Sequence, residues 1–288
     1  MLSYQHKYHA GNHADVFKHL ALIALLSKFN RKSKPYFYLD THAGAGQYAL
    51  SSQGEHQDTY AFTQLSFEHA SEVLQGYKAI IEQYKNANKY PGSPALAISM
   101  AREQDKFHFN ELASEIYREL KYFVHRAGST HQRNGFEVLK GLMPPKPNRG
   151  MVLIDPPYEN ADEYDEVSNA VEDALKKWPN GTFAIWYPVL SSTRVNRKTK
   201  ALEKTPKAGL AEKMLLNLSQ RLEQPILVAQ FGFCNEDSNI GMYASGLCIV
   251  NPPYELDETL NTILMILDSE VSENGAKGSR VYWLNEPK

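Results

Sequence analysis

The sequence predicts an α/β protein built on a doubly wound, mainly parallel sheet. Patterns typical of strands and of helices alternate along most of the 288 residues. One strand pattern, at residues 36 to 39, runs into a glycine-rich turn. Another, at 151 to 155, is apolar throughout, as expected of a strand that helices cover on both faces. The length suits one large domain, which we take as residues 1 to 288.

The elements follow from local patterns taken in chain order. Apolar residues at helical spacing predict an amphipathic helix over 13 to 29. Residues 48 to 90 have helical periodicity and no strand signal, so we interpret them as an inserted helical subdomain. The later elements expected are a helix opening at Ser93, strand 107 to 111, helix 114 to 125, a short strand ending near 134, strand 151 to 155, helix 161 to 177, strand 182 to 187, helix 208 to 222, and strands 225 to 233 and 245 to 250. The last two strands are expected to pair as an antiparallel hairpin.

Composition limits the classes of function. With 31 Lys and Arg against 33 Asp and Glu, the formal net charge is -2, which excludes a protein that coats nucleic acid by overall positive charge. Cys234 and Cys248 are too few for a disulfide framework or a zinc ribbon, which favours a reducing compartment. The longest apolar run, 20 to 26, is far shorter than the roughly 20 residues of a membrane span. We therefore expect a cytoplasmic protein with no membrane partner.

The turn after the first strand contains Gly44 and Gly46, where backbone N–H groups can approach a nucleoside-bearing ligand because glycine has no Cβ. Together with Ala49, these glycines also fit the dinucleotide fingerprint. A nicotinamide or flavin oxidoreductase therefore remains open. So does a tight turn with no ligand.

The sequence Asp155-Pro156-Pro157-Tyr158 lies at the carboxyl end of the apolar strand, where open α/β sheets bind their ligands. An exocyclic aromatic amine is a poor nucleophile because its lone pair is conjugated. The Asp155 carboxylate and the Pro156 carbonyl could accept both amine hydrogens and aim the nitrogen at an electrophilic methyl group. Tyr158 would stack on the base. The alternative is a Pro-Pro turn that only ends the strand.

A second tetrad begins at Asn251. Because it follows the second strand of the expected hairpin, it should lie at the opposite edge of the sheet from Asp155. We therefore assign Asn251 a structural role.

Glu111 ends the strand at 107 to 111, where a carboxylate can accept hydrogen bonds from both hydroxyls of a ribose. A solvated glutamate at a strand end is the alternative. The inserted segment accounts for the long interval between Asp40 and Glu111.

The first 19 residues contain His6, His9, His13 and His19. No cysteine or tight carboxylate cluster accompanies them, so we expect no metal site. Tyr4, His6, Lys18 and His19 are better suited to contact a polyanion or stack on a base. A solvated amino-terminal arm is the alternative.

A basic segment follows the strand at 182 to 187. Six cations stand against one anion, Glu203, a net +5 over residues 194 to 207. The cations are Arg194, Arg197, Lys198, Lys200, Lys204 and Lys207. They fit contacts to nucleic-acid phosphates near the edge that holds Asp155, although a solvated loop remains an alternative.

Over nearly its whole length the chain resembles the bacterial large-subunit ribosomal RNA adenine-N6 methyltransferase J family. The motifs that carry the resemblance are Met-Leu-Ser-Tyr at 1 to 4, His-Ala-Gly-Asn-His-Ala-Asp-Val at 9 to 16, Tyr-Leu-Asp-Thr-His-Ala-Gly-Ala-Gly at 38 to 46, Tyr-Pro-Gly-Ser-Pro at 90 to 94 and Leu-Ile-Asp-Pro-Pro-Tyr at 153 to 158. The resemblance implies a Rossmann-like class I methyltransferase sheet with a small inserted helical subdomain. It also implies S-adenosylmethionine as cofactor and one adenine of 23S ribosomal RNA as target.

The resemblance also implies roles for single residues. Asp155 matches the catalytic residue, and Tyr4 matches the tyrosine that contacts the substrate. Lys18 lies in the same amino-terminal motif, residues 1 to 19, and is assigned to the substrate as well. The implied cofactor contacts are His19, His42, Ser93, Glu111, Asn134, Gly135 and Asp155. The family pattern has aspartate at the place of Asn134, which retains a carbonyl acceptor and lacks the charge.

These observations predict an S-adenosylmethionine-dependent enzyme that methylates the N6 amine of an adenine in 23S ribosomal RNA and acts as a monomer. A DNA adenine methyltransferase is a close alternative, and Asp155 disfavours the related glutamine methyltransferases, whose tetrad begins with Asn. From other classes, a dinucleotide-dependent oxidoreductase and a non-catalytic RNA-binding module remain open.

Overall fold

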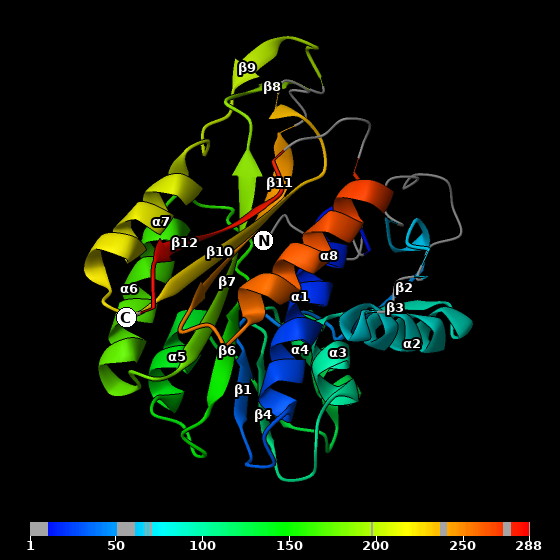
Figure 1. Ribbon diagram of the computed structural model, residues 1–288, viewed down its shortest axis with the longest axis vertical. Coiled ribbons are helices and arrows are strands. Elements are labelled where there is room, and N and C mark those ends of the chain that lie inside the picture. The colour runs from blue at the N-terminus through cyan, green and yellow to red at the C-terminus, as the bar shows by residue number, and fades with distance from the viewer. Residues whose placement is uncertain are drawn as a thin grey trace.

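The computed structural model describes residues 11–50, 61–66, 68, 71–196, 198–236, 241–272 and 278–287. An eight-stranded sheet in the order β12-β10-β11-β7-β6-β1-β4-β5 forms its centre (Figure 1). The strands are β1 (Phe37–Asp40), β4 (Lys106–Asn110), β5 (Ser129–His131), β6 (Gly150–Ile154), β7 (Thr182–Leu190), β10 (Ile226–Gly232), β11 (Met242–Val250) and β12 (Arg280–Asn285).

Strand direction decides where a site can lie. From β5 through β4, β1 and β6 to β7, every neighbouring pair is parallel. Strand β11 is antiparallel to both β7 and β10, and β12 is antiparallel to β10. The predicted doubly wound sheet and the predicted hairpin are both confirmed. The carboxyl ends of β1, β4, β6 and β7 therefore meet at one edge.

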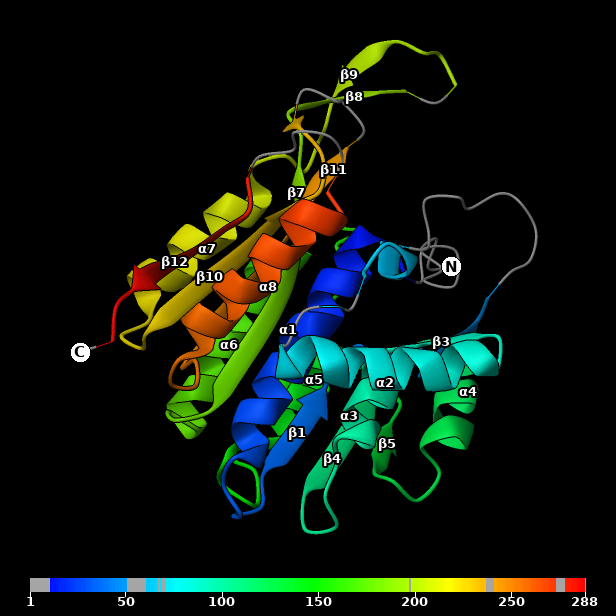
Figure 2. The same cartoon turned by 45° about the vertical axis from the view of Figure 1, so that its right-hand side comes forward.

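Helices cover both faces of the sheet, which is why β1 and β6 are buried along their whole length (Figures 1 and 2). One face carries α1 (His13–Asn30), α2 (Glu72–Asn86), α3 (Ser93–Ser99), α4 (Ser114–Val124) and α8 (Leu256–Glu270). The other carries α5 (Gly135–Leu142), α6 (Glu163–Lys177) and α7 (Leu210–Arg221). Within the described residues, no helix combines the length and apolar character that crossing a membrane requires.

Helix α1 begins with a reciprocal cap. The Asn12 side chain accepts a hydrogen bond from the Asp15 N–H at 2.9 Å, and the Asp15 carboxylate accepts one from the Gly11 N–H at 3.0 Å. The sequence predicted an amphipathic helix here, but α1 is buried around most of its circumference. The reason is that α2, α3 and α8 all pack against it.

The segment at 48 to 90 differs from its prediction as purely helical. Helix α2 is present, but the short strands β2 (Gln47–Ala49) and β3 (Lys89–Pro91) pair antiparallel at the two ends of the segment. A three-residue helix, η3 (Ala61–Thr63), lies between them, while 51–60 fall outside the described residues. The buried side chains of α2 belong to the same core as α1. Division of the chain into a domain and a subdomain stays a prediction.

Several other elements of the structure were not predicted from the sequence. Helices α5 and α8 and strand β12 are additional, and α5 starts where only a strand end was expected. The basic segment forms a hairpin of β8 (Thr193–Val195) and β9 (Leu202–Lys204). In Figures 1 and 2 this hairpin projects away from the main sheet, beyond the carboxyl end of β7.

Candidate active site

A cavity of about 1040 Å³ opens at the sheet edge where β1, β4, β6 and β7 end. It gathers the described residues that the sequence assigned to a site. These are Lys18, His19, His42, Gly44, Ser93, Glu111, Asn134, Gly135, Asp155, Pro156 and Tyr158. Tyr4 lies outside the described residues. One cavity thus unites residues from six separate parts of the chain.

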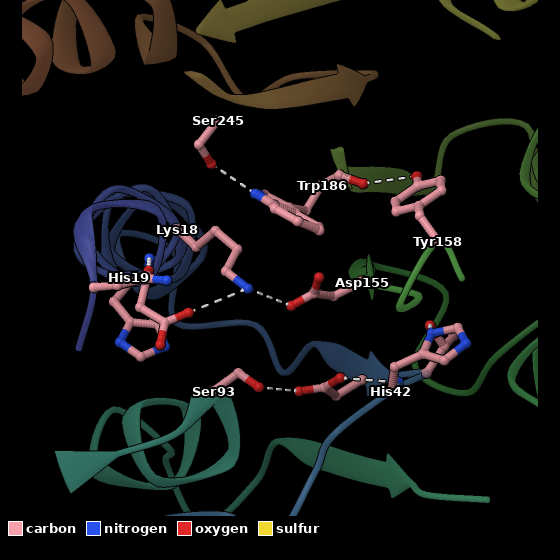
Figure 3. Close-up of polar contacts among 12 residues, drawn as sticks. Lys18, His19, His42, Ser93, Asp155, Tyr158, Trp186 and Ser245 are labelled. Atoms are coloured by element: carbon pink, nitrogen blue, oxygen red, sulfur yellow. Dashed lines mark hydrogen bonds and ion pairs between the residues drawn. The ribbon is translucent and has the colours of Figure 1, made fainter. Parts of the chain in front are cut away.

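Asp155 follows β6 and faces this cavity with 23% of its side-chain surface exposed. The Lys18 ammonium, carried by α1, lies 2.8 Å from Oδ2 of Asp155 and 3.3 Å from Oδ1 of Asp15 (Figure 3). The Lys18 side chain is only 13% exposed. Lys18 therefore contacts the predicted catalytic carboxylate, and it is not open to a polyanion in the way the sequence analysis expected.

Trp186, on β7, forms another wall of the cavity and was not predicted. Its indole N–H donates to the Ser245 hydroxyl at 2.7 Å, and the Lys18 ammonium lies 4.4 Å from its ring centroid. The feature that could have identified Trp186 from the sequence was its position on the strand that neighbours β6.

Tyr158 does not fit the predicted stacking role in this structure. Its ring is 1% exposed and packs against the Tyr164 ring at a centroid distance of 4.3 Å. Its hydroxyl donates to the Trp186 carbonyl at 2.8 Å. These contacts make Tyr158 a buried support of the Asp155 loop, because its ring faces are covered by protein.

Asp40, at the end of β1, contacts two residues of the cavity wall and was not predicted. It is fully buried and accepts hydrogen bonds from the Ser93 hydroxyl at 2.6 Å and from the His42 N–H at 3.2 Å. Burial raises the pKa of Asp40 to about 7. Helix α3 begins at Ser93, as predicted. Gly92 is its N-cap, and the Ser93 hydroxyl donates a hydrogen bond to Asp40.

The hydrogen-bond network assigns the tautomer of His42. The Thr41 hydroxyl donates its proton to the Leu153 carbonyl at 3.0 Å, so its oxygen must accept from Nδ1–H of His42 at 2.8 Å. Burial lowers the pKa of His42 to about 4. His42 is therefore neutral near pH 7, with Nε2 left as an acceptor.

Glu111 directly follows β4 and lies against the glycine-rich turn. Its two carboxylate oxygens accept hydrogen bonds from the N–H groups of Gly44 at 3.1 Å and Ala113 at 2.8 Å. Burial raises its pKa. Gly44 has φ +61°, and a Cβ there would lie 2.2 Å from the Tyr48 hydroxyl oxygen. The positive φ favours glycine at position 44, and a Cβ there would also displace the Tyr48 hydroxyl.

Asn134 has a different local role from the one expected. Its side-chain oxygen accepts hydrogen bonds from the N–H groups of Phe136 at 2.9 Å and Glu137 at 3.3 Å, which makes it the N-cap of α5. That oxygen is therefore committed to the helix and is not a free acceptor for an adenosyl amine. Asn and Asp are both strong N-caps, which gives a physical reason why either residue suits this position. Gly135 follows, and a Cβ there would lie 2.6 Å from Nε2 of His42.

His19 is buried against the inserted segment. Its Nδ1 lies 3.0 Å from the Tyr90 hydroxyl, and the two rings stack at 5.4 Å. Because Tyr90 is on β3, His19 connects α1 with the end of the inserted segment while its edge lines the cavity.

Residues 33–285 match the family model described as ribosomal RNA large subunit methyltransferase D, RlmJ. The chain belongs to this family. Two relatives named ribosomal RNA large subunit methyltransferase J, from Haemophilus influenzae and Escherichia coli K12, are 36% and 33% identical and align over 99% of both chains. The crystal structure of protein LPL1258 from Legionella pneumophila matches with a TM-score of 0.80 and 30% identity, covering 95% of this chain and 98% of that one.

Family membership confirms three predictions: the Rossmann-like methyltransferase fold, an enzyme that methylates ribosomal RNA, and S-adenosylmethionine as its cofactor. Neither the oxidoreductase nor the non-catalytic RNA-binding module gains support. Which residues hold the cofactor and the base stays a prediction.

The cavity fits the implied cofactor on structural grounds. Glu111 still has lone pairs for two hydroxyl donors after accepting from two backbone N–H groups. Glycines at 44 and 135 keep the backbone free of side chains where a ligand must approach. Nε2 of His42 and the exposed part of Asn134 supply further polar partners.

The Asn251 tetrad lies at the opposite edge of the sheet, as predicted from the hairpin. The Asn251 side-chain amide donates to the carbonyls of Pro179 at 2.8 Å and Gly181 at 2.9 Å. It therefore secures the turn that leads into β7. Among the described residues, no group of three or more His, Cys, Asp or Glu is arranged to hold a metal ion, and His6 and His9 lie outside them.

Proposed function

We propose that the chain transfers the methyl group of S-adenosylmethionine to the exocyclic N6 amine of one adenine in 23S ribosomal RNA. The observation that carries this proposal is the position of Asp155. Its carboxylate stands at the carboxyl end of β6, inside the cavity that also contains Glu111 and the glycine-rich turn. Asp155, the proposed hydrogen-bond acceptor for the adenine amine, and Glu111, the proposed acceptor for the ribose, thus face the same cavity.

Asp155 and Pro156 provide the acceptors that an adenine amine needs. The carboxylate accepts one amine hydrogen and the Pro156 carbonyl accepts the other, which turns the nitrogen lone pair out of conjugation and into the cavity. When the nitrogen acquires positive charge, the nearby Asp155 carboxylate stabilises it. The two consecutive prolines fix φ and stiffen this loop.

Lys18 holds the carboxylate in place. Its ammonium contacts Oδ2 of Asp155, so Oδ1 is the oxygen left for the amine. The second carboxylate, Asp15, keeps Lys18 close to this position. Asp15 and Lys18 both belong to α1. This helix therefore orients the loop that carries Asp155.

S-adenosylmethionine supplies the electrophilic methyl group when it is bound. Glu111 would accept hydrogen bonds from its ribose hydroxyls. His42, Ser93, Asn134 and Gly135, which line the same cavity, would border the remainder of the molecule.

We also infer the setting of the reaction. Cys248 is a free and buried thiol, which suits a reducing compartment and supports the cytoplasm as location. The relatives carry the name of a large-subunit ribosomal RNA methyltransferase, which supports 23S RNA as the partner. We propose that the protein acts on this RNA as a monomer.

Transfer of labelled methyl tests the proposal. Unmodified 23S RNA, 16S RNA and duplex DNA are incubated separately with the protein and labelled cofactor, then digested to nucleosides. We expect label in N6-methyladenosine from 23S RNA alone. Label in another nucleoside, or equal transfer to DNA, would refute the proposed substrate.

A further inference from the structure

Lys207 connects the projecting hairpin to the active-site loop. It follows β9 by three residues, where the Thr205 N–H donates to the Ser192 carbonyl at 3.0 Å and closes the base of the hairpin. The Ala208 N–H then donates to the Thr205 carbonyl at 3.1 Å, so Lys207 lies in a tight turn before α7. Its half-buried side chain reaches into the cavity.

The Lys207 ammonium is committed to the backbone of the loop that carries Asp155. It donates to the carbonyl of Tyr158 and, at 3.2 Å, to the carbonyl of Glu159. The sequence analysis counted Lys207 among the phosphate contacts. The structure instead places this cation on two carbonyls just beyond the catalytic aspartate.

The backbone of this loop at Tyr158 requires stabilising contacts. Tyr158 has φ +49°, a left-handed conformation that residues with a Cβ rarely adopt and that persists only when neighbouring contacts impose it. The Tyr158 side chain is held by its hydroxyl, which donates to the Trp186 carbonyl, and by packing on Tyr164. Lys207 holds the backbone of the same residue. The loop is thus fixed through both its side chain and its main chain.

We propose that Lys207 is a positioning residue for methyl transfer, which fixes the backbone at Tyr158 and Glu159 and so sets the aim of Asp155 and Pro156. This inference rests on the proposed function. Its physical basis is that a displacement of about 1 Å in a reacting group can lower a rate by about 100-fold. Lys207 itself touches neither the base nor the cofactor in this role.

Lys207→Met tests the proposal, because it removes the ammonium and keeps most of the apolar stem. The matched control is Lys177→Met. The exposed Lys177 ammonium also donates to a backbone carbonyl, that of Lys140 at 3.2 Å, but it lies at the far end of α6 from the cavity. Three quantities are measured: the single-turnover rate with RNA and cofactor saturating, the RNA affinity over a salt series, and the affinity for S-adenosylhomocysteine.

We expect Lys207→Met to lower the saturated single-turnover rate by roughly 10- to 100-fold. RNA affinity, its salt dependence and S-adenosylhomocysteine affinity should stay within about twofold of the wild type, because no phosphate or cofactor contact is lost. Lys207→Arg should recover most of the rate, since a guanidinium also donates to carbonyls. Lys177→Met should behave like the wild type.

Three results would overturn the proposal. One is a saturated rate for Lys207→Met equal to that of the wild type. Another is weaker RNA binding with a shallower salt dependence and an unchanged rate, which would make Lys207 a phosphate contact. The third is loss of S-adenosylhomocysteine binding in both the Met and Arg variants, which would make its role structural. Failure of the proposed function would appear separately, as a wild-type protein that methylates no RNA.

Discussion

The Lys18 ammonium and the Asp155 carboxylate lie 2.8 Å apart although 137 positions separate them in the chain. The contact joins α1 to the loop after β6 and directs one carboxylate oxygen toward Lys18. The side chain of Asp155 is thus held by a helix that precedes the first strand of the sheet.

Asp155→Ala should abolish detectable methyl transfer while leaving the fold and most cofactor binding intact. The variant removes an acceptor that aims the amine and the charge that stabilises it, and loss of one such preorganised contact costs about 10²–10³ in rate. Single-turnover methylation measures the loss, and calorimetry with S-adenosylhomocysteine is the control. Turnover close to that of the wild type would remove Asp155 from the mechanism.

Glu111→Ala should weaken cofactor binding by roughly 1.5–3 kcal/mol, the usual contribution of hydrogen bonds to a charged group. The carboxylate already accepts from Gly44 and Ala113 and is thereby oriented for hydroxyl donors. Calorimetry with S-adenosylhomocysteine measures the change. The exposed Glu103 supplies the control variant, Glu103→Ala, and equal affinities for the two variants would place Glu111 outside the binding site.

Asp40 should make stability fall with rising pH. Its pKa is raised to about 7 by burial, against about 4 for an exposed aspartate. Between these values the folded protein keeps a proton that the unfolded chain has released, so the free energy of unfolding decreases as pH rises from about 4 to about 7. His42 acts in the opposite sense, because burial lowers its pKa to about 4.

The variant Asp40→Asn separates the contribution of Asp40 to the pH dependence of stability from that of His42. Relative to the wild type, its free energy of unfolding should rise by roughly 2–3 kcal/mol between pH 5 and pH 8, since the variant lacks the titrating carboxyl. Urea unfolding of both proteins at the two pH values measures this difference. Parallel pH profiles for the two proteins would contradict the assigned pKa.

Asn251→Ala should affect stability and leave chemistry unchanged. It removes two hydrogen bonds to the carbonyls of Pro179 and Gly181 at the edge of the sheet away from the cavity. The bond to Pro179 is exposed and the bond to Gly181 is partly buried, so the loss of each is expected to cost about 0.5–1.5 kcal/mol. A lower urea midpoint with an unchanged saturated methylation rate is expected, and a slower saturated rate would be incompatible with a purely structural tetrad.

The β8–β9 hairpin should bind the RNA backbone. Lys198 and Lys200 are exposed near its tip, and the overall charge of -2 provides no general attraction for RNA. The double variant Lys198→Glu, Lys200→Glu should bind RNA more weakly and with a shallower salt dependence, at unchanged S-adenosylhomocysteine affinity. Lys106→Glu, at the opposite edge of the sheet, is the control. Equal losses in both proteins would indicate a non-specific charge effect.

Strand and helix order was readable from the sequence because it depends on local patterns. The apolar run of β6 identified a strand covered on both faces, and the position of Asp155 directly after it identified the edge where the cavity lies. Gly44 was equally readable, because its positive φ is a local property of the turn. Strands β2 and β3 were missed since each has three residues and gains its hydrogen bonds from the other, about 40 positions away.

By itself, the sequence determined the sheet, the edge that holds the site and the residue types at that edge. Only the tertiary structure decided what each side chain contacts. The Ser93 hydroxyl donates to Asp40, and the Lys18 ammonium pairs with Asp155. Lys207 was expected to contact phosphate, but its ammonium donates to the backbone of the loop after Asp155. The physical reason is that a buried polar group must find a partner, and packing of distant elements determines which partner is within hydrogen-bond distance.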